Sequence, residues 1–386
     1  MTDGRPLRVA TVITRLDGGA GQHALRGARV LDPAEFTMTI ITGSGGQLLA
    51  EAVAAGLEVV VEPSLRAPIA PASDLRALTR LSTLLRRRQF DVVHTHCAKA
   101  GAVGRLAAHR ARVPRLVHTY HGFPFHEFQG AARRQGYIQI ERRLGRITDV
   151  ALCVGTGVAV EAVRRRLIAP ERVRTIGVVA DGADQAAARP PPAAARRRRA
   201  RAELGLPADA TVVGAVGRLT YQKAPDDFLA ALRALGRPGV TGVWVGDGEL
   251  AGQVAARAAS LPGSQVLLAG QRSNVPDLLP AFDVFALPSR YEGLPTAVVE
   301  AMVCGIPVVA TAVNAVGDVV IPGETGLLVP PGRPELLAEA VGFLLDTPAA
   351  AARLAATARD RLGTRFGENA LRGALVAAYS GGYAVA

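Results

Sequence analysis

Residues 283–311 read DVFALPSRYEGLPTAVVEAMVCGIPVVAT, and this stretch decides the fold of the second half of the chain. It begins with a short apolar run, turns at Glu292, continues as a helical stretch that contains Glu300, and ends in a second apolar run. Proline is favoured at the first position of a helix, so Pro295 predicts the helix start. An apolar strand, a helix and a second apolar strand in this order predict a parallel β-sheet with a right-handed crossover.

The same alternation runs through the whole chain and occurs in two blocks. In the first block we predict strands at residues 7–14, 36–42, 57–62, 91–96, 115–120 and 149–155. In the second block we predict strands at residues 211–217, 241–246, 265–270, 283–288 and 306–311. The sequence therefore predicts an α/β protein of two doubly wound, Rossmann-like parallel-sheet domains that face a central cleft, with ligands beyond the carboxyl ends of the strands.

A break in the alternation separates the two blocks. Residues 181–201 read DGADQAAARPPPAAARRRRAR, and prolines, alanine runs and a block of arginines are typical of a linker or an exposed connection. We therefore predict an N-terminal domain over 1–185, a linker over 186–202, a C-terminal domain over 203–365 and a C-terminal helix over 366–386. The arginine block is open to two interpretations, a solvated helix start or a contact with a membrane.

Composition narrows the compartment and the partners. The chain has 386 residues and a formal net charge of +12, and among its 45 basic residues only Lys99 and Lys223 are lysines. This charge suits phosphate-bearing small molecules or an anionic membrane surface, and we see no nucleic-acid-binding motif. No stretch approaches the ~20 apolar residues that span a bilayer, and the start does not resemble a signal peptide, so we expect a cytoplasmic protein. Cys97, Cys153 and Cys304 are too few and too widely spaced to suggest disulfides or a zinc site.

Charged residues follow predicted strands in the second block. Arg218 and Lys223 lie in VGRLTYQKAPD, residues 216–226, where a planar fork and a compact cation together suit a diphosphate. The helix start at Pro295 offers free amides to the same kind of anion. Glu292 and Glu300 can each accept hydrogen bonds from paired hydroxyls of one ligand. Alternatively, the two glutamates are incidental residues of a surface helix, and the two cations are simply exposed to solvent.

Glycine turns and histidines follow other strands. Gly18 and Gly19 lie in LDGGAGQH, residues 16–23, and let the backbone approach a ligand closely. This turn lacks the G-x-G-x-x-G fingerprint, which disfavours an NAD-dependent oxidoreductase. Gly246 lies in WVGDGEL, residues 244–250, where ligand contact and a plain tight turn are both open. His121 follows a predicted strand and can reach a sugar or a phosphate.

Two histidines that lie two residues apart on one predicted strand could form part of a metal site. His94 and His96 face the same side of residues 91–96. The cysteines and carboxylates near them lack the spacing of metal ligands, and the chain has no Asp-x-Asp pair for a metal-bound nucleotide. We therefore predict no metal and no cofactor.

Taken together, the segments GGAGQH, HTYHG, GRLTYQK, VGDGE, YEGLPTAVVEAMVCGIPVVAT and GETGLLVPP resemble glycosyltransferase family 4 over about residues 8–345. FPFHEFQ and NAVGDVV resemble most the branch that builds surface polysaccharides. The resemblance implies a GT-B fold, with the acceptor mainly on the N-terminal domain and the nucleotide sugar mainly on the C-terminal domain. It also implies that the C-terminal helix crosses back to the N-terminal domain.

The resemblance also implies roles for individual residues. Glu300 would bind the ribose hydroxyls, and Glu292 would bind donor-sugar hydroxyls near the reacting carbon. Arg218 and Lys223 would hold the diphosphate, His121 would contact the donor sugar, and the turn of Gly18 and Gly19 would close over the phosphate. The expected catalytic set consists of Glu292, His121, Arg218 and Lys223. The expected donor-binding set adds Gly18, Gly19, Gly246, Gly293, Leu294, Pro295, Thr296 and Glu300. Ala224 departs from the family, which commonly has glycine there.

The implied activity is metal-independent transfer of a hexosyl or N-acetylhexosaminyl group with retention, from a nucleotide sugar, with UDP as the expected nucleotide. The expected acceptor is a glycan or a polyprenyl-linked sugar in polysaccharide or cell-envelope biosynthesis, at the inner membrane face. Two alternatives stay open: a soluble transferase for a small natural product, and a non-catalytic protein that binds nucleotide sugars. The donor sugar, the linkage and the oligomeric state do not follow from the sequence.

Overall fold

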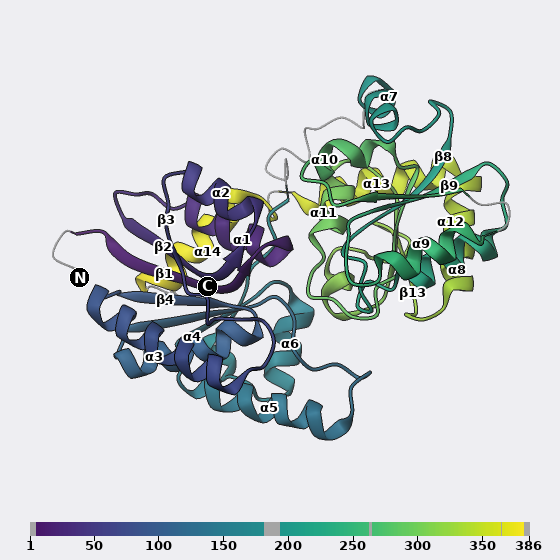
Figure 1. Cartoon of the computed structure of the whole chain (residues 1–386). Helices are drawn as coiled ribbons and strands as arrows, with labels where there is room; N and C mark the ends of the chain where they lie inside the picture. The colour runs from purple at the N-terminus through teal and green to yellow at the C-terminus, as the bar shows by residue number, and fades with distance from the viewer. Residues whose placement is uncertain (1–4, 181–193, 262–264, 364, 382–386) are drawn as a thin grey trace. The chain divides into compact units, whose positions relative to one another are not determined.

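The computed structural model describes residues 5–180, 194–261, 265–363 and 365–381 (Figure 1). The chain forms two compact units, one from Met1–Val179 with Glu368–Ala386 and the other from Ala180–Gly367. Each unit has its own parallel sheet covered by helices on both faces, and the predicted fold class is confirmed.

The N-terminal unit is built on a sheet of seven described strands in the order β3-β2-β1-β4-β5-β6-β7. The strands are β1 (Leu7–Leu16), β2 (Phe36–Gly45), β3 (Glu58–Val61), β4 (Val92–His96), β5 (Arg115–Tyr120), β6 (Val150–Cys153) and β7 (Val173–Thr175). The helices are α1 (Gly18–Arg29), α2 (Gln47–Ala54), α3 (Pro71–Arg88), α4 (Ala98–Ala111), α5 (Ala131–Arg146), α6 (Thr156–Arg164), the 3-10 helix η1 (Pro170–Arg172) and α14 (Glu368–Ser380). The central strands are buried on both faces, and β4 buries two histidines and a threonine together with its two valines.

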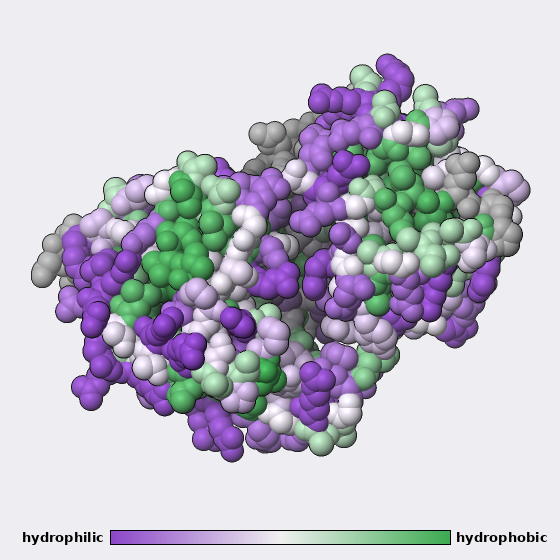
Figure 2. All heavy atoms as spheres, viewed as in Figure 1, coloured by the Kyte–Doolittle hydropathy of each residue, from purple (hydrophilic) through white to green (hydrophobic). Residues whose placement is uncertain are grey.

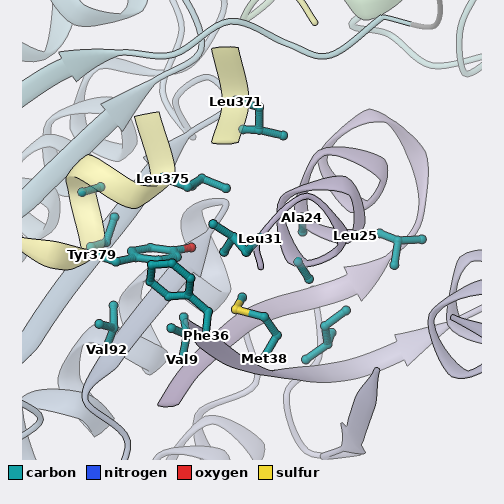
Figure 3. Close-up of a cluster of buried hydrophobic side chains, with 14 of the residues drawn as sticks. Val9, Ala24, Leu25, Leu31, Phe36, Met38, Val92, Leu371, Leu375 and Tyr379 are labelled. Atoms are coloured by element: carbon teal, nitrogen blue, oxygen red, sulfur yellow. The ribbon is translucent and has the colours of Figure 1, made fainter. Parts of the chain in front are cut away.

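The C-terminal helix α14 completes one face of this sheet. Leu371, Leu375 and Tyr379 of α14 are buried in one apolar cluster with residues of α1, β1 and β2 (Figure 3). In Figure 1 the yellow helix α14 lies beside α1 although the two are far apart in sequence. The end of the chain is therefore an integral part of the N-terminal core.

The opposite face of the sheet is covered by α3 and α4, and a buried ion pair joins α4 to α5. Nη2 of Arg105 donates to Oε2 of Glu141 over 2.8 Å, and the hydroxyl of Tyr120 donates to the same oxygen over 3.1 Å. All three side chains are buried. Tyr120 is the last residue of β5, so this pair holds the end of the strand from which the chain continues to His121.

The C-terminal unit is built on six described strands in the order β10-β9-β8-β11-β12-β13. The strands are β8 (Thr211–Val216), β9 (Val240–Val245), β10 (Gln265–Gly270), β11 (Val284–Leu287), β12 (Val308–Thr311) and β13 (Leu327–Val329). The helices are α7 (Ala194–Glu203), α8 (Pro225–Leu235), α9 (Ala251–Ala259), α10 (Val275–Leu278), α11 (Thr296–Val303), α12 (Pro334–Asp346) and α13 (Pro348–Leu362), with 3-10 helices η3 (Leu279–Ala281) and η4 (Asn314–Asp318). Phe228, Trp244 and Leu337 are buried in its core.

The linker predicted over residues 186–202 differs from the structure in its second half. Residues 181–193 lie outside the described residues, but Ala194–Glu203 form α7. Arg201 is buried, and its Nη2 donates to Oδ2 of Asp283 over 2.9 Å; Arg197 pairs with the same carboxylate. Pairing with a carboxylate removes the repulsion that keeps a block of arginines solvated, so part of this block belongs to the C-terminal unit.

Hydrophilic residues cover much of the visible surface of both units (Figure 2).

Candidate active site

A buried lysine–glutamate pair lies at the carboxyl ends of β8 and β11. Nζ of Lys223 donates to Oε1 of Glu292 over 2.6 Å, and the side chains are 16% and 5% exposed. Strands β8 and β11 are neighbours in the parallel sheet, so the loops that follow them meet at one edge. The structure thus brings together two of the predicted site residues, although they are far apart in sequence.

Further polar groups hold the Glu292 carboxylate and its backbone. Oγ of Ser289 donates to Oε1 over 2.6 Å, and the backbone N–H of Glu292 donates to Oδ1 of Asn314 over 3.0 Å. Gln222 lies further off, with Nε2 3.4 Å from Oε2. Gln222, Ser289 and Asn314 all lie in segments quoted above, but none was among the predicted site residues, because only the folded structure brings them to Glu292. They fix the carboxylate in one orientation at the edge of the sheet.

The segment after Glu292 leads directly into α11. Gly293, Leu294 and Pro295 are buried, and the helix begins at Thr296. Pro295 therefore caps the helix and is not its first residue as predicted, because its ψ of 115° is extended. Glu300 lies one turn inside α11 and is buried, 8% exposed.

Arg218 and Gly246 lie on two neighbouring loops of the same edge. Arg218 follows β8 and is exposed. Gly246 follows β9 with a φ of +136°, and a Cβ there would lie 2.1 Å from the carbonyl oxygen of Gly217. Indole Nε1 of Trp244 donates to that same carbonyl over 2.8 Å. Gly246 is thus required by the close approach of two loops, and its contact with a ligand stays a prediction.

Ala224, where the related family commonly has glycine, has a left-handed backbone with φ 51° and ψ 55°. It directly precedes α8, and its neighbour Lys223 carries the ammonium group that reaches Glu292. Only glycine adopts this conformation without steric cost, which accounts for the family's usual residue.

The N-terminal unit contributes a glycine turn and a cluster of histidines. Gly18 and Gly19 form the first turn of α1, with Gly18 at φ +58°, and no acidic side chain lies in that turn. His23, one turn further, packs its ring against the ring of His121 with centroids 5.3 Å apart. Nδ1 of His96 lies 2.9 Å from Nε2 of His121. The structure thus connects the α1 turn to His121 through His23. His23 is the last residue of the quoted segment 16–23, but it was not among the predicted site residues.

Burial keeps these histidines neutral. Burial, and after it the charge of Arg26, lowers the pKa of His23 to about 4. Burial also holds the pKa of His121 well below its usual range, with His96 and His23 adding to the effect. A neutral imidazole has one donor and one acceptor nitrogen, so it can both give and accept a hydrogen bond.

The described residues were searched for clusters of metal ligands and for helices that could span a membrane. Within them, no group of three or more histidine, cysteine, aspartate or glutamate side chains is arranged to hold a metal ion. In the same part of the chain, no helix is both long and apolar enough to cross a membrane.

Known proteins are similar to this chain in both sequence and fold. The family Glycosyltransferase Family 4 matches residues 17–178, and Glycosyl transferases group 1 matches residues 196–361. An Escherichia coli UDP-Gal:alpha-D-GlcNAc-diphosphoundecaprenol alpha-1,3-galactosyltransferase is 29% identical, over 77% of this chain and 76% of its own length. A D-inositol 3-phosphate glycosyltransferase of Xylanimonas cellulosilytica is 34% identical, over 75% of this chain and 72% of its own length. One of Rhodococcus opacus is 36% identical, over 70% of this chain and 62% of its own length, so the chain spans less than two thirds of that relative.

Solved structures agree on the architecture. Anabaena Alr3699/HepE in complex with UDP and glucose has a TM-score of 0.82 at 21% identity, over 97% of this chain and 100% of that one. WaaG, a glycosyltransferase involved in lipopolysaccharide biosynthesis, has a TM-score of 0.75 at 17% identity, over 97% of this chain and 100% of that one. At these identities the likeness shows the fold, which is GT-B. The matching families and relatives show in addition that this chain belongs to glycosyltransferase family 4.

Proposed function

We propose that this glycosyltransferase transfers a hexosyl or N-acetylhexosaminyl group from a UDP-sugar, with retention at the anomeric carbon and without a metal. The observation that carries the proposal is the buried Lys223–Glu292 pair at the carboxyl edge of the sheet. A cation beside a carboxylate would suit a ligand that carries both a diphosphate and sugar hydroxyls. The names of two relatives support the donor: the E. coli enzyme uses UDP-Gal, and the Anabaena structure contains UDP and glucose.

When the donor binds, Lys223 and Glu292 would give up their contact with each other and each would contact the donor instead. A diphosphate carries more negative charge than one carboxylate, so we expect Lys223 to turn from Glu292 to the phosphates. Exposed Arg218 and the amides at the start of α11 add to the positive charge there. Glu292 then accepts hydrogen bonds from the sugar, and buried Glu300 accepts them from the ribose.

The reaction would proceed on one face of the sugar. The bond from the anomeric carbon to the diphosphate oxygen breaks, and the acceptor oxygen bonds to the carbon on that same face. The departing phosphate oxygen takes the acceptor's proton, so no protein base is needed. The protein's part is positioning and electrostatic stabilisation of the leaving group.

The first test identifies the donor and the need for metal. Thermal shift is measured against UDP-, GDP-, ADP- and dTDP-sugars, with and without EDTA, because a bound ligand stabilises the folded protein. We expect a UDP-sugar to raise the midpoint equally in both conditions. A shift that EDTA abolishes would refute metal independence, and no shift from any sugar nucleotide would favour the non-catalytic alternative.

The second test addresses the pair itself. We expect K223A and E292Q each to lower kcat by ~10²–10³-fold, because each removes a charge that acts on the transition state. The matched control is D283N, which breaks the ion pair with Arg201 at the opposite edge of the same sheet. D283N should lower the unfolding midpoint but leave kcat unchanged. Near-wild-type turnover in both K223A and E292Q would refute the assignment.

For the acceptor we propose a polyprenyl-linked sugar or glycan, presented to a protein that lies at the inner membrane face. Arg133, Arg143 and Arg146 of α5 are exposed beside Ile140, which is 46% exposed, so cations and an apolar side chain share one helix. The name of the E. coli relative specifies a lipid-linked GlcNAc acceptor. Each arginine near an anionic membrane contributes ~1 kcal/mol to binding. Flotation with anionic liposomes at moderate salt should carry the protein upward; failure to float, with turnover on a water-soluble acceptor, would favour the natural-product alternative.

A further inference from the structure

The donor contact that the family resemblance implies for His121 would depend on a set of rings that we call the histidine cluster: His23, His94, His96 and His121. His94 and His96 lie on β4 with ring centroids 4.2 Å apart. His96 and His121 have centroids 5.2 Å apart, and Nδ1 of His96 faces Nε2 of His121 at 2.9 Å. His23 of α1 packs edge-on against both His96 and His121.

The inner end of the cluster is fixed by hydroxyl groups. Nδ1 of His94 lies 2.7 Å from the hydroxyl of Tyr379 on α14, and its Nε2 lies 2.7 Å from Oγ1 of Thr119 on β5. His94 is thus bonded at both nitrogens and stacks against His96. Cys97, the next residue, has φ 63° and ψ 168°, a region that is almost restricted to glycine. The position of the His96 ring is therefore set by packing on one side and by a constrained backbone on the other.

One proton is shared along the His96–His121 contact. Burial keeps the pKa of both rings well below the usual range, so each carries a single proton at neutral pH. The titratable groups that act on His121 are His96 from β4 and His23 from α1, and His94 of β4 and His118 of β5 interact with it as well. Either His96 donates from Nδ1 and His121 holds its proton on Nδ1, or His121 donates from Nε2 and its Nδ1 is bare.

The ligand decides which arrangement is useful. Phosphate oxygens only accept hydrogen bonds, so a ring that contacts them must donate. We propose that His96 is a positioning residue: by donating Nδ1–H to Nε2 of His121, it keeps a proton on Nδ1 of His121, the nitrogen that then donates to an oxygen of the sugar nucleotide. This inference rests on the proposed function, because it assumes that His121 meets the donor.

Two substitutions of His96 separate hydrogen bonding from packing. In H96N the amide nitrogen is as many bonds from the backbone as Nδ1, so it can still donate to His121. In H96F the ring volume stays but no donor remains, and His121 is free to move its proton to Nε2. We expect H96F to lower kcat ~10–100-fold with KM little changed, and H96N to restore most of the loss.

The pH dependence gives a readout that a packing role would not move. His96 contributes to the lowered pKa of His121, so H96F should raise that pKa. Protonation of His121 places a proton on both nitrogens and restores the donor at Nδ1. The ratio of kcat in H96F to kcat in wild type should therefore rise as the pH falls from 8 toward the pKa of His121.

The companion variant H121A distinguishes failure of the inference from failure of the proposed function. Loss of activity in H121A and H96F, recovery in H96N and a ratio that rises at low pH would support the inference. If H121A loses activity but H96F does not, or if H96N is as impaired as H96F at every pH, the positioning role is refuted. If H121A turns over UDP-sugar like wild type, the proposed contact of His121 with the donor is wrong.

Discussion

The N-terminal unit should lose stability in mild acid because His23 is buried as a neutral ring. Its pKa falls from 6.5 in the unfolded chain to about 4 in the folded protein. Below pH 6.5 the unfolded state binds a proton that the folded state does not, so the free energy of unfolding falls with pH down to about 4 and then levels off. A shift of this size corresponds to about 3 kcal/mol. The other buried histidines have lowered pKa values as well, so they add to the loss.

The assay can follow the two units separately. All seven histidines belong to the N-terminal unit, whereas the single tryptophan, Trp244, is buried in the core of the C-terminal unit. Native-state hydrogen exchange of amides in β4 and β5 reports the N-terminal unit, and Trp244 fluorescence reports the other. Between pH 6.5 and 4, the amides of β4 and β5 should lose more than a hundredfold of their protection, corrected for intrinsic exchange.

Substitution of His23 tests the cause. H23L removes the titrating ring and, with it, two buried nitrogens that have no hydrogen-bond partner among the described residues. We expect H23L to be at least as stable as wild type at pH 7 and to reduce the pH slope by up to ~1.4 kcal/mol per pH unit. H109L, at an exposed position of α4, is the matched control and should keep the wild-type slope. An unchanged slope in H23L would refute the reasoning.

Three further sets of substitutions test features that support the two units. R105M and E141Q should each cost ~3–5 kcal/mol because each leaves a buried charge unpaired, and the uncharged double variant should lose less than either one; additive losses in chemical denaturation would contradict this. C97G should raise the free energy of unfolding by ~1–2 kcal/mol by relieving a strained backbone, whereas C97A, which keeps the Cβ, should give no gain in the same measurement. G246A should lower the midpoint of the Trp244 fluorescence transition, because its Cβ would lie 2.1 Å from a backbone oxygen, while G252A, with open space around it in α9, should not.

Most of the fold follows from the sequence because short apolar runs, repeated between helical stretches, mark most strands of four or more residues. The strands missed were β7 and β13, which have three residues each, too few to show a pattern. The block of arginines after residue 193 resembled a linker by composition. Its place in α7 depends on Asp283, about 80 residues away, and such a pairing is invisible to composition.

For the candidate site, the sequence indicated residue types and positions but not the contacts between them. Glu292 and Lys223 were selected by residue type and position, but their contact depends on β8 and β11 being neighbours in the sheet. His94 and His96 were predicted to share a face from the two-residue period of a strand, and their ring centroids lie 4.2 Å apart. Tyr379 gave no signal, because only the packing of α14 into the N-terminal unit brings its hydroxyl to His94.

Among the candidate site residues, the two units bury their polar groups in different ways. The C-terminal unit buries a charge, and the carboxylate of Glu292 is tolerated because Lys223 and Ser289 satisfy it. The N-terminal unit buries rings that give up their charge, so its histidine cluster needs no counter-ion. The charged pair is therefore suited to bind an anionic group such as a diphosphate, whereas the neutral rings, each with one donor and one acceptor nitrogen, are suited to orient individual oxygens.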